Sequence, residues 1–425
     1  MAKISSVLGL NARNYLYIHR YNLPRAKRFA DEKILGKKLL VKHHLPTPKP
    51  VAVFRHFKDV ERFSWERLPA SFVVKPNQGY GGEGIWIIKK RAKYAGEWFR
   101  ADGVKITWEE IKLHLLDILE GQYSLHDVPD FAFIEERIPV HKKLRKYTYR
   151  GTPDIRVVVF NKVPVIAELR LPTKESGGRA NLHQGAVGVG VDIASGVTTN
   201  AVLYDEPIKF VPGKEAKLVG FSIPSWEEIL ILAVRAAQVS GLGFSGVDIV
   251  IDPDRGPMVL ELNSRPGLAI QLANLAPLKR RLERVEGLKV DSAEKGVRIA
   301  QALFSKTLPS RLAKDRKVIG LFEEVKVEDR RGKRHKVLAK IDTGADRTSI
   351  DRYLARSLGL LDKKNILFKR YYKSALGREK RELIGLTFYL AKRKVRTSAS
   401  VSSRVGLRTK IIVGRRDLKG FILKP

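Results

Sequence analysis

The sequence predicts an α+β protein in which a large mixed domain is followed by a small all-β domain. The chain has 425 residues, which is more than one compact core organises. Strand-like runs and amphipathic helices alternate until about residue 312, and short strands separated by basic turns follow. We expect an N-terminal helical region over 1–50, a main domain over 51–312 and a basic β domain over 317–425.

The net charge of +36 is the most unusual feature of the composition. From Arg316 onward there are 31 basic and 11 acidic residues, so this last part has a net charge of about +20. Such a field attracts a ribosome, RNA, another polyanion, an acidic peptide or an anionic membrane surface. A solvated basic surface that keeps the protein soluble is the alternative.

The chain contains no cysteine, which excludes disulfides and thiolate metal sites and fits a cytoplasmic protein. No run approaches the roughly 18 apolar residues that a membrane-spanning helix needs. The charged and aromatic N-terminus has no continuous apolar segment. We therefore expect neither a transmembrane segment nor a signal peptide.

The elements follow from local patterns along the chain. Prolines in "HHLPTPKPV" end the N-terminal helices and begin an extended segment. We expect a strand, a turn and a strand over 71–90, helices over 108–119 and 225–243, and a strand over 131–138. A hairpin over 154–171 turns at Asn161 and Lys162, and "GVDIVID" and "PMVLELN" pair around "PDRG".

A glycine-rich turn lies between the strands of "SFVVKPNQGYGGEGIWIIKK". It contains Gly79, Gly81, Gly82 and Gly84. Such a loop lets backbone N–H groups approach a phosphate closely. It is neither a Walker A motif nor a dinucleotide fingerprint, because no GK[ST] and no helix follow. Lys75 ends the preceding apolar strand, where a partly buried cation requires an anion. A purely structural hairpin is the alternative.

Three polar residues interrupt the strands that flank "PDRG". Glu261 and Asn263 share one face of their strand, and Asp248 can meet them from the neighbouring strand. Carboxylate and amide oxygens suit Mg²⁺ or Mn²⁺. The alternative is that Asp248 pairs with a surface lysine while Glu261 is a rim charge.

The order of these motifs, together with "IEERI", "DIR" and "RANLHQG", resembles the ATP-grasp superfamily over roughly residues 25–285. Within the superfamily the sequence is similar to RimK-type ligases and to the alpha-L-glutamate ligase-like subgroup. The resemblance implies an ATP-grasp fold with a shortened N-terminal helical region. It also implies an ATP-dependent carboxylate–amine ligase that works through an acyl-phosphate.

The resemblance implies a role for each residue that matches a family motif. Those expected to bind ATP are Lys75, the loop Gly79–Gly84, Glu135, Glu136, Arg137 and Ile138 around adenine and ribose, and Asn181 near the γ-phosphate. Those expected at the reacting groups are Arg156 and Arg170 at the phosphates and the acyl-phosphate, Arg265 at a substrate carboxylate, and Asp248, Glu261 and Asn263 at Mg²⁺. Arg156 could instead pair with Asp154, and Arg170 could be a surface residue. The short N-terminal region leaves the amine and carboxylate substrates undetermined, and glutamate or another amino acid is expected.

A second motif, "KVLAKIDTGADRTSID", resembles the retropepsin-like half-barrel, in the form of an ATP-dependent zinc protease domain. Asp342 would then be a catalytic aspartate. Aspartic proteolysis needs two carboxylates, so a homodimer would have to supply the second. His335 stands alone, so the sequence offers no zinc ligand set. Three functions stay open: a ligase with a docking or dimerising β domain, a fused ligase and peptidase, and a non-catalytic nucleic-acid- or ribosome-binding protein.

Overall fold

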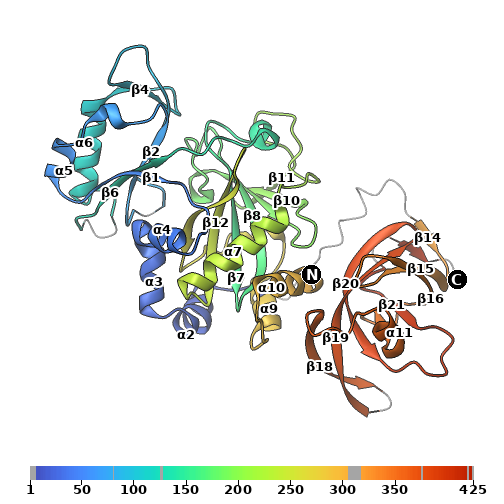
Figure 1. The fold of residues 1–425 in the computed structure, drawn as a ribbon. Helices are drawn as coiled ribbons and strands as arrows, with labels where there is room; N and C mark the ends of the chain where they lie inside the picture. Colours follow the sequence, from blue (N-terminus) through green and yellow to red (C-terminus); the bar gives the residue numbers. More distant parts are fainter. Residues whose placement is uncertain are drawn as a thin grey trace. The chain divides into compact units, whose positions relative to one another are not determined.

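The computed structural model describes residues 6–79, 81–124, 128–304, 317–374, 377–418 and 421–423. The chain forms two compact units (Figure 1). The first comprises Met1–Val191 and Gly196–Arg284, and the second comprises Asp192–Ser195 and Val285–Pro425. The predicted boundary near 312–317 lies outside the described residues, apart from Lys317.

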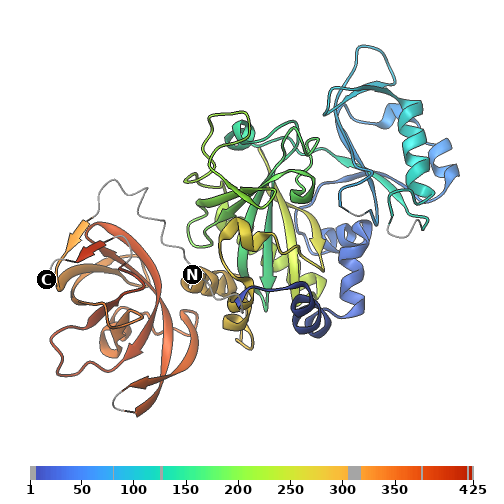
Figure 2. The same ribbon diagram turned by 180° about the vertical axis from the view of Figure 1, so that it is seen from behind.

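The N-terminal region is helical. Its elements are α1 (Leu10–Ala12), the π-helix η2 (Arg13–Ile18), α2 (His19–Tyr21), α3 (Pro24–Asp31) and α4 (Lys33–Lys42). The Tyr17 ring packs edge-on against Phe160 at 5.4 Å, and the Asn22 side chain bonds both the N–H and the C=O of Phe244. The π-helix η2 and the end of α2 are therefore fixed at one end of the second sheet, whereas α3 and α4 contact its edge strand, Gly256–Asn263 (Figures 1 and 2).

The first sheet is antiparallel, with the strand order β1-β6-β2-β3-β4-β5. Its strands are β1 (Pro50–Phe54), β2 (Phe72–Pro76), β3 (Trp86–Arg91), β4 (Glu97–Arg100), β5 (Lys105–Thr107) and β6 (Ala132–Glu136). The helices that belong with this sheet are α5 (Phe57–Glu61), α6 (Trp108–Leu119) and the 3-10 helix η3 (Trp65–Arg67). Thr107 and Glu110 form a capping box that begins α6, whose apolar face closes the core of this sheet (Figure 1).

The second sheet is also antiparallel, with the order β11-β10-β9-β8-β7-β12-β13. Its strands are β7 (Asp154–Phe160), β8 (Val163–Leu171), β9 (Val187–Val191), β10 (Thr198–Leu203), β11 (Glu206–Ile208), β12 (Phe244–Asp252) and β13 (Gly256–Asn263). Asn161 and Lys162 have φ of 49° and 60°, which confirms the predicted hairpin turn. Helix α7 (Trp226–Ser240) packs against β12, β13, β7 and β8, and α8 (Ile270–Asn274) packs against β8, β9 and β10. The 3-10 helices η5 (Lys142–Tyr147) and η6 (Leu182–Gln184) lie in the connections.

The second unit is built on a seven-stranded sheet of order β15-β16-β21-β17-β20-β19-β18, and a further pairing of β15 with β19 curls it towards a barrel. These strands are β15 (Phe322–Glu328), β16 (Arg334–Asp342), β17 (Ser349–Asp351), β18 (Ile366–Ser374), β19 (Gly377–Leu390), β20 (Arg393–Ser402) and β21 (Ile411–Gly414). Strands β14 (Lys317–Ile319) and β22 (Phe421–Leu423) pair in parallel. Helices α10 (Ala293–Phe304) and α11 (Arg352–Ser357) belong to this unit, whereas α9 (Leu278–Val285) belongs to the first unit up to Arg284. Among the described residues, no helix is long and apolar enough to cross a membrane.

Candidate functional site

A buried ion cluster joins α4 to the first sheet. Glu135 on β6 is 1% exposed, and its carboxylate pairs with Lys75 on β2 and, at 2.7 Å, with Lys37 on α4. Burial alone would raise the pKa of Glu135, but the two ammonium groups outweigh burial and hold the pKa below its ordinary value. The structure places Glu135, which is expected near adenine and ribose, beneath the surface as the partner of two lysines.

Lys33 adds a third ammonium group to this cluster. Its Nζ donates to the carbonyl oxygens of Gly79, at 3.0 Å, and Asn77, at 3.3 Å. Burial lowers the pKa of both Lys33 and Lys37 despite their acidic neighbours, because desolvation disfavours the charged amine. Three desolvated ammonium groups beside a glycine loop favour the binding of a polyanion.

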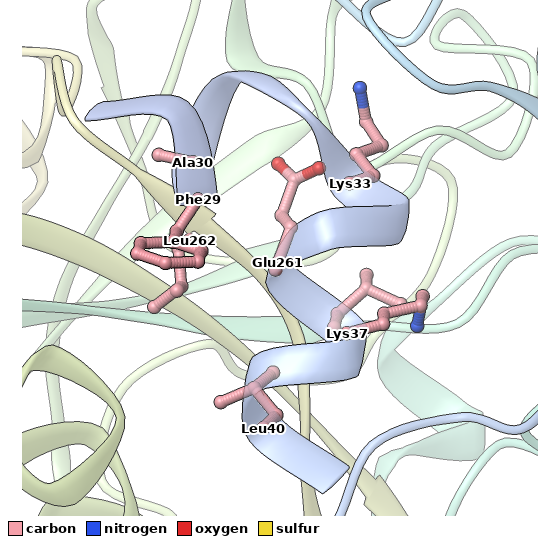
Figure 3. A pocket seen from close by; sticks show the side chains of 9 residues that line it. Phe29, Ala30, Lys33, Lys37, Leu40, Glu261 and Leu262 are labelled. Carbon is pink, nitrogen blue, oxygen red and sulfur yellow. The ribbon is translucent and has the colours of Figure 1, made fainter. Parts of the chain in front are cut away.

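Figure 3 shows how α4 and β13 meet beside this cluster. The Glu261 carboxylate projects from β13 alongside the helix that carries Lys33 and Lys37. The two lysines and Glu261 line a small, partly open hollow, whose remaining walls are apolar. Sequence reasoning missed Lys33 and Lys37. Their i, i+4 spacing in the apolar helix "KILGKKLL" is the signal that could have identified them.

The predicted glycine loop connects β2 to β3, and its glycines are required by its conformation. Gly81, Gly82 and Gly84 have φ of 66°, 84° and 68°. A Cβ on Gly79 would lie 2.2 Å from Pro76, and one on Gly84 would lie 2.6 Å from the Tyr123 ring. The loop is tied to the second sheet by Asn181, whose Nδ2 donates to the Gly81 carbonyl at 2.7 Å.

Charged side chains form a row across four neighbouring strands of the second sheet. The register places Glu168, Arg156, Asp248 and Glu261 directly opposite one another on β8, β7, β12 and β13. Arg170 and Asp154 form the adjacent cross-strand pair. The antiparallel pairing therefore brings together carboxylates and guanidinium groups that lie up to 107 positions apart in the sequence.

Asp248 is the centre of this row and is 0% exposed. Arg156 binds it with Nε and Nη2, both at 2.7 Å, and Arg170 binds it with Nη2 at 2.6 Å. Burial would raise the pKa of Asp248, but the two guanidinium groups hold it well below its usual range. The alternative that Asp248 pairs with a surface lysine is therefore wrong.

Arg170 also binds both carboxylate oxygens of Asp154, at 2.6 and 2.7 Å, and is only 8% exposed. The alternatives that Arg170 is a surface residue and that Arg156 pairs with Asp154 are therefore wrong as well. Both arginines are held rigidly in the row, because each of them donates to a carboxylate with two nitrogens.

The composition of this row fits a divalent cation. Asp248 and Glu261 are cross-strand partners, and the Asn263 Nδ2 donates to Asp248 at 3.2 Å. Burial raises the pKa of Glu168 to about 7. Even without Glu168, the two arginines offset only two of the three carboxylates of Asp154, Asp248 and Glu261, so negative charge remains beside the Asp248–Glu261 pair. Asp248, Glu261 and Asn263 are the residues that would hold the ion.

These ligands do not enclose a cation by themselves. Within the described ranges, no group of three or more His, Cys, Asp or Glu residues is arranged to hold a metal ion. A Mg²⁺ ion keeps several waters and is commonly held by one or two carboxylates together with substrate phosphates. The arrangement suits an ion that arrives with a phosphate-bearing ligand.

The segment after β6 connects the two sheets. Ile138 packs with Val250, Met258 and Leu260 in a small apolar cluster beside the charged row. Glu136 accepts from the Lys49 N–H at 2.8 Å and pairs with Arg255 at 2.9 Å. The Arg137 Nε is buried without a hydrogen-bond partner, and burial lowers the Arg137 pKa. Leu260 is the partly exposed member of this otherwise buried apolar cluster.

Arg265 lies at the surface, apart from the charged row. Its side chain is 53% exposed and pairs with Asp31 of α3 at 2.9 Å. The structure therefore places it on the solvent side of the loop that follows Asn263.

The second predicted site, at Asp342, ends β16 in the second unit. Its Oδ1 accepts from the backbone N–H groups of Gly344, at 2.9 Å, and Ala345, at 3.1 Å. Strand β21 pairs in parallel with β16 and places Gly414 opposite Asp342. His335 pairs with Asp329 at 2.7 Å. Asp342 thus stabilises its own turn through one carboxylate oxygen.

Curated relatives match only part of the chain. A "Probable alpha-L-glutamate ligase" of Pseudomonas putida strain F1 is 31% identical over 138 residues, which are 32% of this chain and 34% of the relative. A protein of the same name from Aeromonas salmonicida is 34% identical over 115 residues, which are 27% of each chain. The matched segment thus spans about a third of the length of these relatives or less.

Among solved structures, the D-cycloserine synthetase DcsG is similar with a TM-score of 0.36 and 16% identity, over 61% of this chain and 71% of that chain. The family model described as "Sugar-transfer associated ATP-grasp" matches residues 12–287. This range contains the ion cluster, the glycine loop and the charged row. The chain belongs to the sugar-transfer associated ATP-grasp family.

Proposed function

We propose that the chain is an ATP-dependent ligase that joins a carboxylate to an amine through an acyl-phosphate, with ATP and Mg²⁺, or Mn²⁺, as its cofactors. One observation carries the proposal. A cluster of three lysines beside a glycine loop lies in the same unit as a row of carboxylates that fits a divalent cation. Family membership and the ligase names of the partial relatives support it.

The residues of this chain have distinct tasks in such a reaction. Lys33, Lys37 and Lys75 would bind phosphate oxygens, and the loop Gly79–Gly84 would cover them. When bound, Mg²⁺ would neutralise phosphate charge beside Asp248, Glu261 and Asn263. Ile138 and its apolar neighbours, with the backbone of Glu136 and Arg137, would receive adenine and ribose.

The chemistry needs no side-chain nucleophile. An oxygen of the substrate carboxylate attacks the γ-phosphorus, and the bond from that phosphorus to the bridging oxygen breaks as ADP leaves. Arg156 and Arg170, held in place by Asp248 and Asp154, supply positive charge where the acyl-phosphate forms. The amine then attacks the acyl carbon, inorganic phosphate leaves, and an amide remains.

The amine is proposed to be glutamate or another amino acid, and the carboxylate an acidic peptide or amino acid, with Arg265 at a substrate carboxylate. The net charge of about +20 beyond Arg316 supports an acidic partner, such as the substrate peptide, a ribosome or another polyanion. The basic β domain would recruit that partner or form a homodimer.

A retropepsin-like peptidase in the second unit is a second candidate function. The Asp342-Thr343-Gly344 turn supports it, together with the parallel pairing of β16 and β21. In that arrangement Asp342 of two copies would form the catalytic pair. A non-catalytic nucleic-acid- or ribosome-binding protein is the third candidate, and it is less well supported because the whole charged row is present.

The experiment that tests the ligase proposal traps its intermediate. The protein is incubated with Mg-ATP, hydroxylamine and a panel of amino acids and acidic peptides, and hydroxamate and ADP are measured together. Hydroxamate equal to ADP, lost in Lys33→Met but kept in Leu113→Ala, which changes an exposed residue of α6, is the expected result. ADP without hydroxamate for every carboxylate would contradict an acyl-phosphate mechanism.

A further inference from the structure

His114 is a buried imidazole that contacts the glycine loop from behind. It lies on α6, is 2% exposed, and places Nε2 2.8 Å from the Gly84 carbonyl oxygen. Its ring stacks on Trp86, the first residue of β3, with centroids 4.0 Å apart and planes 5° from parallel. One histidine therefore contacts both the last glycine of the loop and the strand that follows it.

The partners of His114 define its tautomer. A carbonyl oxygen only accepts hydrogen bonds, so Nε2 carries the proton and donates it. Nδ1 faces the Tyr123 hydroxyl at 3.5 Å. Burial lowers the pKa of His114 to about 4, so the ring is neutral at physiological pH and Nδ1 is free to accept.

The loop is held at two points. Asn181 binds the Gly81 carbonyl from the second sheet, and His114 binds the Gly84 carbonyl from α6. Gly84 has a φ of +68°, and the Tyr123 ring occupies the space that a side chain would need. The end of the loop is thus built around the His114–Tyr123–Trp86 cluster, so the loop has less freedom to lose when a ligand binds.

We propose that His114 is a positioning residue for nucleotide binding, which holds the glycine loop in the conformation that receives phosphates. The inference rests on the proposed function, because it concerns the same loop. His114 acts through the Gly84 carbonyl and does not itself contact the nucleotide. Without this hydrogen bond the free loop would be less ordered, and ordering it would consume part of the binding free energy of the nucleotide. The affinity for nucleotide should therefore fall about tenfold.

The test compares variants that differ in one hydrogen bond. The Nε2 of glutamine can occupy the place of the histidine Nε2, whereas asparagine is too short and leucine cannot donate. We would measure the Kd of a non-hydrolysable ATP analogue with Mg²⁺ by calorimetry for His114→Gln, His114→Asn and His114→Leu. The control is Leu113→Ala, because Leu113 lies on the same helix and is 62% exposed.

The expected result is that His114→Leu and His114→Asn bind the analogue about tenfold more weakly, while His114→Gln and Leu113→Ala stay within about threefold of the wild type. Amide hydrogen exchange of the loop, measured without nucleotide, should accelerate in the Asn and Leu variants alone. If His114→Leu does not fold, the comparison of Gln with Asn decides. Equal affinity and equal exchange in all variants would overturn the inference. A wild-type protein that binds no analogue would overturn the proposed function, and with it this inference.

Discussion

Replacing Glu135 by glutamine should strongly destabilise the first unit. The change removes the carboxylate that Lys37 and Lys75 share, and all three side chains are at most 10% exposed. At an effective dielectric constant of about 20, one such contact contributes roughly 4 kcal/mol, and breaking a buried pair costs about 3–5 kcal/mol. We expect Glu135→Gln to lose about 3–5 kcal/mol, because two buried ammonium groups keep no full counter-charge.

Tryptophan fluorescence in a urea titration measures this loss selectively. All five tryptophans belong to the first unit, so the signal reports the unfolding of that unit. The matched control is Glu136→Gln, because the Glu136 side chain is 26% exposed and pairs with the 41% exposed Arg255. Its loss should stay below about 1 kcal/mol. Pyrophosphate should stabilise Glu135→Gln more than the wild type. Equal midpoints for the two variants would refute the buried cluster.

Three further variants test other parts of the structure. Gly84→Ala should lower the free energy of unfolding more than Gly213→Ala and should also weaken nucleotide binding. Both glycines have nearly the same φ, but of the two only Gly84 faces an aromatic ring within 3 Å. Equal losses of stability in denaturation would contradict this. The pKa of His114 is about 4 when folded and about 6.5 when unfolded, so the unfolded chain gains the proton first and wild-type stability falls as the pH drops from about 6.5 to 4. In His114→Gln the free energy of unfolding should decrease by about 3 kcal/mol less over this pH range than in the wild type. Parallel curves of stability against pH for the two proteins would refute this role of His114. Asp342→Asn should leave ATP-dependent ligation unchanged and abolish any peptidase activity on acidic peptides, and ligation lost with the variant would show that the two units act together.

Local patterns predicted the elements that form the site. The helix over 108–119 was predicted with its observed limits from its amphipathic pattern, and the structure adds a capping box at its start. The turn "PDRG" and the alternation beyond it brought Asp248 opposite Glu261. A β-bulge next to Asp248 maintains this pairing, and no feature of the local sequence predicts the bulge.

The side-chain contacts that could not be predicted from the sequence depend on pairing between segments far apart in the chain. Arg156 and Arg170 were expected to face phosphates, and their anchoring to Asp248 depends on strand order across 92 and 78 positions of the chain. Lys33 and Lys37 were missed because their partners, Asn77, Gly79 and Glu135, lie on strands and loops far along the sequence. Their spacing on one helix face gave a signal, but only the fold assigns that face to the glycine loop.

The most direct test of the ligase account is ADP release with Mg-ATP across a panel of amino acids and acidic peptides, compared between the wild type and Glu261→Gln. Glu261 is the partly exposed carboxylate of the pair that would hold the cation, so its amide variant should fold normally and lose its response to Mg²⁺. The account predicts substrate-dependent ADP release in the wild type, with an amide product detected by mass spectrometry, and at least a hundredfold loss in the variant, on the order of 3 kcal/mol. Equal, substrate-dependent ADP release by both proteins would contradict it.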